Sequence, residues 1–84
     1  MKEELIKCIG LELADIRKSK GLLILKVADN TNTNKDTISK YENGNSSMKI
    51  YILADLLDYY NVPIDIFFEK VYARMQKWIN LATN

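Results

Sequence analysis

The chain has 84 residues, of which 48% are hydrophobic and 27% are charged, and its formal net charge is +1. This composition is typical of one soluble globular domain with a small core, which regular helix packing or a partner chain should help to stabilise. A single cysteine and the lack of histidine exclude an intrachain disulfide, a zinc-ligand set and a Cys/His nucleophile pair. We therefore expect no metal, no cofactor and no enzymatic activity.

Positive charge gathers in the middle third of the sequence. Residues 17–49 hold seven lysines and arginines against three acids, a net charge of +4, whereas residues 1–16 carry −2 and residues 50–84 carry −1. A polyanion responds to local charge rather than to the total. The chain begins without a secretory signal pattern and has no apolar run of membrane-spanning length, so we expect a cytoplasmic protein with no membrane partner.

The first predicted helix runs from about Glu3 to Ser19. It has one apolar stripe at spacings of four, four and three residues, formed by Leu5, Ile9, Leu13 and Ile16. Cys8 should lie near the edge of the core, and Gly21 stands where a left-handed residue commonly ends a helix. A short second helix is predicted from Leu22 to about Asn30.

Four small polar residues, Thr31 to Asn34, separate the second helix from the third. We expect Asn32 to adopt the left-handed conformation of a tight turn and Asn34 to cap the following helix. The third helix, from about Lys35 to Asn43, has only Ile38 and Tyr41 as apolar residues. Most of its surface should therefore face solvent or a polar partner.

Two more apolar helices complete the pattern. The fourth is predicted from about Met48 to Tyr60, with Ser47 as its cap and an apolar stripe formed by Ile50, Leu53, Leu57 and Tyr60. Pro63 suits the first turn of a fifth helix. Because no alternating strand pattern competes, the sequence predicts an all-α fold.

A short helix, a polar turn and a mostly polar helix, set between apolar helices, are typical of a helix-turn-helix. In that arrangement the third helix anchors through Ile38 and Tyr41 and presents its remaining surface to the DNA major groove. Two runs carry a specific resemblance at the expected separation: Arg17 to Leu22, and Thr-Ile-Ser-Lys-Tyr-Glu-Asn-Gly at residues 37–44. Over residues 9–68 the chain resembles the Cro/C1-type helix-turn-helix repressors of phages, plasmids and bacteria.

The resemblance implies a compact five-helix, lambda-repressor-like domain that binds a palindromic operator as a homodimer without a cofactor. The expected function is sequence-specific binding of double-stranded DNA by a transcriptional regulator, a repressor that occludes a promoter. The alternative is a protein-interaction module, an antitoxin or antirepressor, that keeps the fold and binds a protein partner through its C-terminal helix. Leu23 and Ile24 favour this alternative, because the family usually has a polar cap and a glutamine there.

Candidate DNA contacts lie on and around the third helix. The family's base-reading positions fall at 35, 36 and 40, where lysine can donate to guanine and aspartate can accept from cytosine; the candidates for base contact are Lys35, Asp36, Thr37 and Lys40. The candidates for phosphate contact are Arg17, Asn34, Ser39, Asn43, Asn45, Ser46 and Lys49. These side chains could instead form a solvated face and helix caps. Arg17 and Glu42 resemble the family's internal ion pair.

The sequence divides into a helix-turn-helix domain, residues 1–69, and a C-terminal helical extension of the fifth helix, residues 70–84. Large apolar side chains in the extension would be a liability if they stayed exposed, and we interpret them as a dimer interface: Val71, Tyr72, Met75, Trp78 and Ile79. On this interpretation, truncation after Glu69 leaves a folded monomer. The alternative is that the extension folds back over helices one and four of its own chain.

Overall fold

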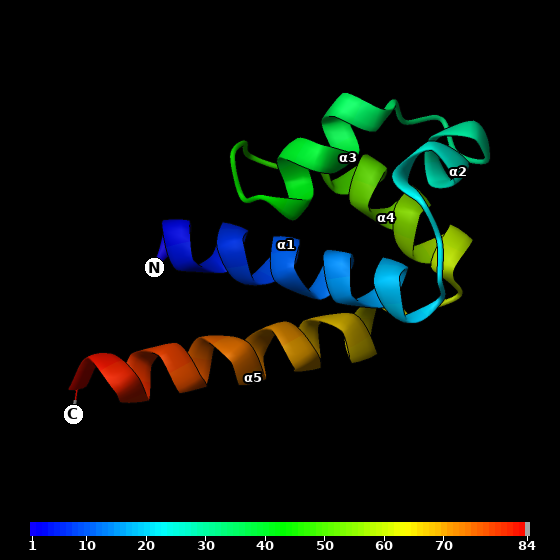
Figure 1. The fold of residues 1–84 in the computed structure, drawn as a ribbon. Coiled ribbons are helices and arrows are strands. Elements are labelled where there is room, and N and C mark those ends of the chain that lie inside the picture. The colour runs from blue at the N-terminus through cyan, green and yellow to red at the C-terminus, as the bar shows by residue number, and fades with distance from the viewer. Residues whose placement is uncertain (84) are drawn as a thin grey trace.

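The computed structural model describes the backbone of residues 1–83 and the side chains of residues 1–79. Five helices follow one another along the chain (Figure 1): α1 (Lys2–Ser19), α2 (Ile24–Asp29), α3 (Lys35–Glu42), α4 (Ile50–Tyr60) and α5 (Ile64–Thr83). No strand occurs among the described residues, and the expected all-α, five-helix fold is confirmed. Within the same part of the chain, no helix is long and apolar enough to cross a membrane.

Helix α1 lies between α3 and α5, and the two termini of the chain lie at the same end of the α1–α5 pair (Figure 1). Its buried positions are Cys8, Ile9, Gly10, Glu12 and Leu13. At 3.6 residues per turn these positions cover roughly half of the helix circumference. A single apolar stripe would be narrower, so α1 packs against neighbours on two sides.

The core draws on every helix. Its buried hydrophobic residues are Cys8, Ile9, Leu13, Val27, Ile38, Tyr41, Leu53, Leu56, Leu57, Tyr60, Phe67, Val71 and Met75. Two expectations were wrong at its edges. Cys8, expected near the edge of the core, is fully buried. Ile50, expected in the apolar stripe of α4, is 64% exposed, because it stands at the first position of that helix.

Three helices end in the same way, with a left-handed residue just past the last turn. Gly21, Gly44 and Asn61 have φ of 67°, 67° and 59°, and the next amide donates back across the turn. These bonds join the Leu22, Asn45 and Val62 amides to the Arg17, Lys40 and Leu57 carbonyls at 3.1, 2.9 and 3.0 Å. This is the Schellman arrangement, which satisfies carbonyls that a helix end leaves free.

The helix starts differ from the expectations. Helix α2 begins at Ile24, and its cap, Leu23, offers no side-chain acceptor. Helix α4 begins at Ile50 and is preceded by Lys49 rather than by Ser47 as its cap. Asn32 does not have a positive φ, so the turn before α3 is made without a left-handed residue.

Helix α5 runs without a break through the expected domain boundary at residues 69 and 70. Val71 and Met75 are 1% and 9% exposed and belong to the core of their own chain, so their assignment to a dimer interface was wrong. For the same reason, truncation after Glu69 would remove part of the core. The final residue of the expected extension, Asn84, lies outside the described residues.

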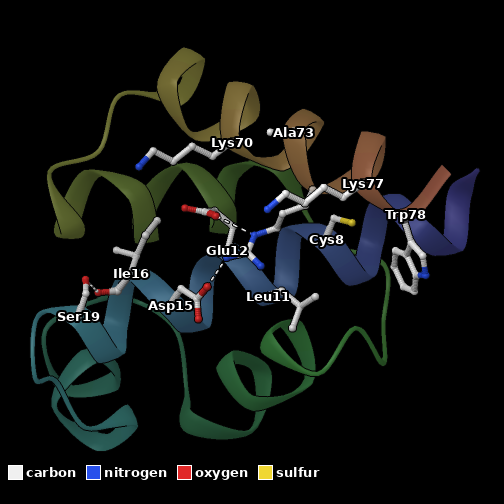
Figure 2. Close-up of a pocket in the computed structure, with 11 residues that line it drawn as sticks. Cys8, Leu11, Glu12, Asp15, Ile16, Ser19, Lys70, Ala73, Lys77 and Trp78 are labelled. Atoms are coloured by element: carbon white, nitrogen blue, oxygen red, sulfur yellow. Dashed lines mark hydrogen bonds and ion pairs between the residues drawn. The ribbon is translucent and has the colours of Figure 1, made fainter. Parts of the chain in front are cut away.

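An arginine fastens α5 to α1 across this packed interface. Arg74 Nε donates to Glu12 Oε1 at 2.9 Å, and its Nη2 contacts Asp15 Oδ2 (Figure 2). The Glu12 side chain is only 9% exposed, and a carboxylate at that depth needs a charged partner. Arg74 supplies it, so the docked position of α5 is fixed by charge as well as by apolar contact.

Gly10 sets how closely α1 approaches α3. A Cβ atom at this position would lie 2.3 Å from the Tyr41 carbonyl oxygen and 2.7 Å from the Glu42 carbonyl oxygen. Both obstacles are backbone atoms, which cannot rotate away. Any larger residue at position 10 must therefore push the C-terminal end of α3 outward.

We expect Gly10→Ala to destabilise the fold by about 1–3 kcal/mol, the usual cost of overpacking. The sign of the change in the free energy of unfolding is diagnostic, because alanine in a helix interior ordinarily stabilises a protein by about 1 kcal/mol relative to glycine. Urea unfolding followed by circular dichroism measures the change. A variant as stable as the parent would show that α1 and α3 do not meet this closely.

Candidate nucleic-acid interface

Helix α3 is anchored on a narrow buried stripe. Ile38 and Tyr41 are 1% and 4% exposed, and their spacing of three residues places them on one side of the helix. The Tyr41 hydroxyl also accepts a hydrogen bond from the Lys49 backbone N–H at 3.1 Å. Tyr41 therefore fixes both α3 and the loop that leaves it.

The start of α3 is capped by its own sequence. Asn34 Oδ1 accepts a hydrogen bond from the Thr37 amide at 2.8 Å, as an N-cap residue should. The side-chain NH₂ group of Asn34 makes no hydrogen bond to the described residues and is free to donate. Lys35 and Asp36 are exposed in the first turn, whereas Thr37 is half-buried.

The outer face of α3 is polar. Asp36, Lys40 and Asn43 are exposed and are spaced four and three residues apart, which puts them on one face, opposite Ile38. Asn43 Nδ2 donates to Ser39 Oγ at 3.3 Å, so these two side chains order each other. The arrangement presents hydrogen-bond donors and acceptors on a helix whose inner face is held rigidly.

Further polar and basic side chains surround this face. In the loop after α3, Asn45 and Lys49 are exposed and Ser46 is half-buried. The Lys49 ammonium lies 6.0 Å from the centre of the Tyr51 ring, near the outer limit of a cation–π contact. Exposed lysines also occur at the end of α1 and in α2: Lys18, Lys20 and Lys26.

Arg17 joins α1 to the end of α3. Its Nε and Nη2 donate to the two carboxylate oxygens of Glu42 at 2.7 and 3.0 Å, and its Nη1 donates to the Leu22 carbonyl at 2.8 Å. The hydrogen bond to Glu42 raises the pKa of Arg17. Such a bidentate pair fixes orientation as well as distance.

The geometry of Arg17 separates its two expected roles. The expected ion pair with Glu42 is present. The side chain of Arg17 is only 11% exposed, and all three nitrogens of its guanidinium are bonded inside the protein. The expected phosphate contact of Arg17 is therefore wrong, because its guanidinium group points inward and orients α3 instead.

The turn between α2 and α3 leaves one polar group without a partner. The Thr33 hydroxyl is buried and makes no hydrogen bond within the described part of the chain. By contrast, the Thr31 hydroxyl donates to the Val27 carbonyl at 2.9 Å.

The sequence did not reveal two other contacts that shape this interface. The Tyr41 hydroxyl bond to the loop could not be expected from an apolar pattern, which marks Tyr41 only as a core residue. The close approach at Gly10 could not be expected either, because a glycine within a helical pattern does not show which segment packs against it. The first contact depends on the path of the loop after α3 and the second on how α3 packs against α1, and the local sequence pattern specifies neither.

The comparisons with known proteins agree with this geometry. The sequence model described as "Helix-turn-helix" matches residues 13–67. The structure is similar to the clp gene regulator ClgR from Corynebacterium glutamicum, with a TM-score of 0.87 and 16% identity over 94% of this chain and 84% of that one. It is also similar to the DNA-binding domain of BldD, with a TM-score of 0.71 and 29% identity over 80% of this chain and 97% of that one. No curated protein matches the sequence.

We expect Arg17→Ala to destabilise the fold by about 3 kcal/mol, because it leaves the Glu42 carboxylate buried without its partner. Urea unfolding measures the change, with Lys18→Ala, an exposed neighbour on the same helix, as the control within about 0.5 kcal/mol. The double variant Arg17→Met/Glu42→Leu should recover much of the loss, since it strands no charge. If Arg17→Ala had the same free energy of unfolding as Lys18→Ala, the ion pair would contribute nothing to the stability of the fold.

Thr33→Val should stabilise the fold by about 1 kcal/mol, because it removes a buried hydroxyl that has no partner while keeping the side-chain shape. In a domain of this size that corresponds to a rise in Tm of roughly 4–8 °C. Thr31→Val is the matched control and should lower the Tm, since it breaks the bond to the Val27 carbonyl. A fall in Tm for Thr33→Val would mean that the hydroxyl has a partner in solution.

Proposed function

The chain belongs to the helix-turn-helix family, the DNA-binding domains of Cro/C1-type transcriptional regulators, and we propose that it is a sequence-specific regulator that binds double-stranded DNA through α3. We further propose that it acts as a homodimeric repressor on a palindromic operator. Occupation of such an operator within a promoter would exclude RNA polymerase. The observation that carries the proposal is that α3 is anchored on one buried side and exposes a polar face on the other.

The reading surface is the exposed part of α3. Lys35, Asp36 and Lys40 are exposed on a helix whose opposite side is buried and whose end is fastened by the Arg17–Glu42 pair. A recognition helix enters the major groove with its N-terminal residues toward the bases. Lys35 and Lys40 would donate to guanine, Asp36 would accept from cytosine, and Thr37 would contact the groove from its half-buried position.

Phosphate contacts would flank these base contacts. The free NH₂ group of Asn34 stands at the start of α3, where the helix dipole favours an anion. The ordered pair Ser39 and Asn43 and the exposed Asn45 and Lys49 follow along the helix and its loop, with Ser46 beside them. Contacts of this kind fix the register of a protein on the duplex without reading sequence.

Two exposed leucines favour the second candidate function, a protein-interaction module. Leu23, just before α2, and Leu25, within α2, are 73% and 59% exposed, and Leu23 stands where the family usually has a polar cap, whereas Ile24 is half-buried. A protein partner would bury the two leucines. Selection of bound duplexes from a random-sequence pool, followed by gel shift, separates the two functions. Enrichment of one palindromic sequence supports the regulator, and failure to bind any duplex supports the alternative.

On the selected site, Lys35→Ala and Lys40→Ala should each weaken binding by about 1–3 kcal/mol and relax the preference at one base position. Lys49→Ala is the comparison, because loss of a phosphate contact should weaken binding to all sequences alike and reduce the salt dependence. Gel shifts against the site and its single-base variants measure both effects. Unchanged affinity and preference in both α3 variants would show that α3 is not the reading element.

A further inference from the structure

A groove of 720 Å³ runs between α1 and α5, and every described residue that lines it belongs to one of these two helices (Figure 2). The lining residues extend over residues 8–19 of α1 and residues 70–78 of α5. At a rise of 1.5 Å per residue, these two walls are roughly 16 and 12 Å long. The groove therefore has room along its length for about two to three turns of another helix.

Large apolar side chains in this groove remain in contact with water. Leu11 of α1 is 48% exposed and Trp78 of α5 is 40% exposed. Ala73, which also lines the groove, is exposed as well, and its small side chain allows a neighbouring helix to approach closely. Exposed apolar surface that is bordered by charged residues commonly marks an interaction site.

The ionic groups of the groove leave it with free positive charge. Both of its acids, Glu12 and Asp15, contact Arg74 and are thereby neutralised within the chain. Lys70 and Lys77 also line the groove, are exposed and form no ion pair among the described residues. A partner that fills the groove must therefore bring acidic groups, because potentials of opposite sign meet across specific interfaces.

The spacing of the two free lysines is that of a helical heptad. Lys70 and Lys77 are seven residues apart on one face of α5, which is roughly 10 Å along the helix axis. A helix that lies along α5 with carboxylates seven residues apart places one of them opposite each lysine. Charges at the e and g positions of coiled coils act in this way, since they flank an apolar stripe and set the choice of partner. The apolar stripe of the partner would cover Leu11 and Trp78.

We propose that the α1/α5 groove is a docking site for an amphipathic helix of another protein, whose acidic residues flank its apolar stripe. A helix in a groove is a recurrent mode of protein recognition, and Lys70 and Lys77 supply its selectivity. The same groove of a second copy is a poor occupant, because its own acids are already paired with Arg74. The inference goes beyond the proposed function and does not depend on DNA binding by α3.

A partner in this groove leaves the reading surface free. Helix α3 lies on the other side of α1 from α5 (Figure 1), and none of its residues lines the groove. Lys35 and Lys40 therefore stay open while the groove is occupied. The domain can hold DNA and a partner protein at the same time, which would bring that partner to the DNA.

The intrinsic fluorescence of Trp78 measures occupation of the groove. Trp78 is the only tryptophan of the chain and lines the groove, so an occupant that covers it shifts its emission to shorter wavelength. The probe is a synthetic peptide about three heptads long, with leucine at the a and d positions, glutamate at e and g, and no aromatic residue. We expect a saturable blue shift with a dissociation constant on the order of 100 µM or below. The same peptide with lysine at e and g should give no saturable shift.

Reversal of the charge of the groove should reverse its preference between the two peptides. Lys70→Glu/Lys77→Glu should weaken binding of the glutamate peptide by more than about tenfold and bind the lysine peptide instead, because like charges that meet across an interface repel. Lys18→Glu/Lys26→Glu is the matched control. It changes the net charge equally, at exposed lysines that do not line the groove, and should keep the preference of the parent.

Circular dichroism melting checks that each variant is folded. If Lys70→Glu/Lys77→Glu does not fold, salt provides the same test on the parent. Raising the salt concentration from about 50 to about 500 mM should weaken binding of the glutamate peptide severalfold, because it screens exposed charges. Binding that does not change with salt would show that the lysines do not select the partner and would overturn the inference.

Absence of a saturable shift at about 1 mM peptide, equal affinity of the parent for the two peptides, or an equal loss in the Lys18→Glu/Lys26→Glu control would also overturn it. So would a blue shift that grows with protein concentration alone, which would assign the groove to a second copy. A blue shift produced by DNA would assign the groove to nucleic acid instead. Peptide binding is measured without DNA, so failure of the parent to bind any duplex would remove the proposed function and leave this result standing.

Discussion

The close packing of α1 against two neighbours is the constraint on which the rest of the structure depends. On one side, Gly10 allows the backbone of α3 to approach to a distance that no side chain would permit. On the other, Cys8 and Glu12 lie beneath α5. Because α1 is a rigid rod shared by both contacts, the position of α3 relative to α5 follows from the packing of this one helix.

An arginine–carboxylate contact fastens each side of α1. Arg17 of α1 binds Glu42 at the end of α3, and Arg74 of α5 binds Glu12 of α1. Apolar packing tolerates small rotations and slides of one helix past another, whereas a forked hydrogen bond does not. The two pairs therefore add a defined orientation to the packing of a small core. They hold α3 and α5 in a fixed relation to each other.

The sequence was informative where the structure depends on local chemistry and much less so where distant segments meet. The narrow stripe of Ile38 and Tyr41, the cap at Asn34 and the left-handed Gly21 were predictable, because each follows from spacing or from the backbone of one residue. The end of the fifth helix was misjudged. Periodicity shows that Val71 and Met75 need burial but cannot say whether their own chain or another covers them. The partner of Arg74 was equally hidden, because its carboxylates lie about sixty positions earlier in the chain.

Because Cys8 is buried, the reactivity of its thiol can report the movement of the helices that cover it. The thiol is 1% exposed, on the α5 side of α1, and burial raises its pKa, so both access and thiolate formation are suppressed while the helices stay together. A thiol reagent can react with it after α5 lifts away from α1 or after the whole domain unfolds. An alkylation rate faster than global unfolding allows would therefore report the local opening of this helix. Because no second cysteine competes for the reagent, the unaltered protein can be studied in this way without an introduced label.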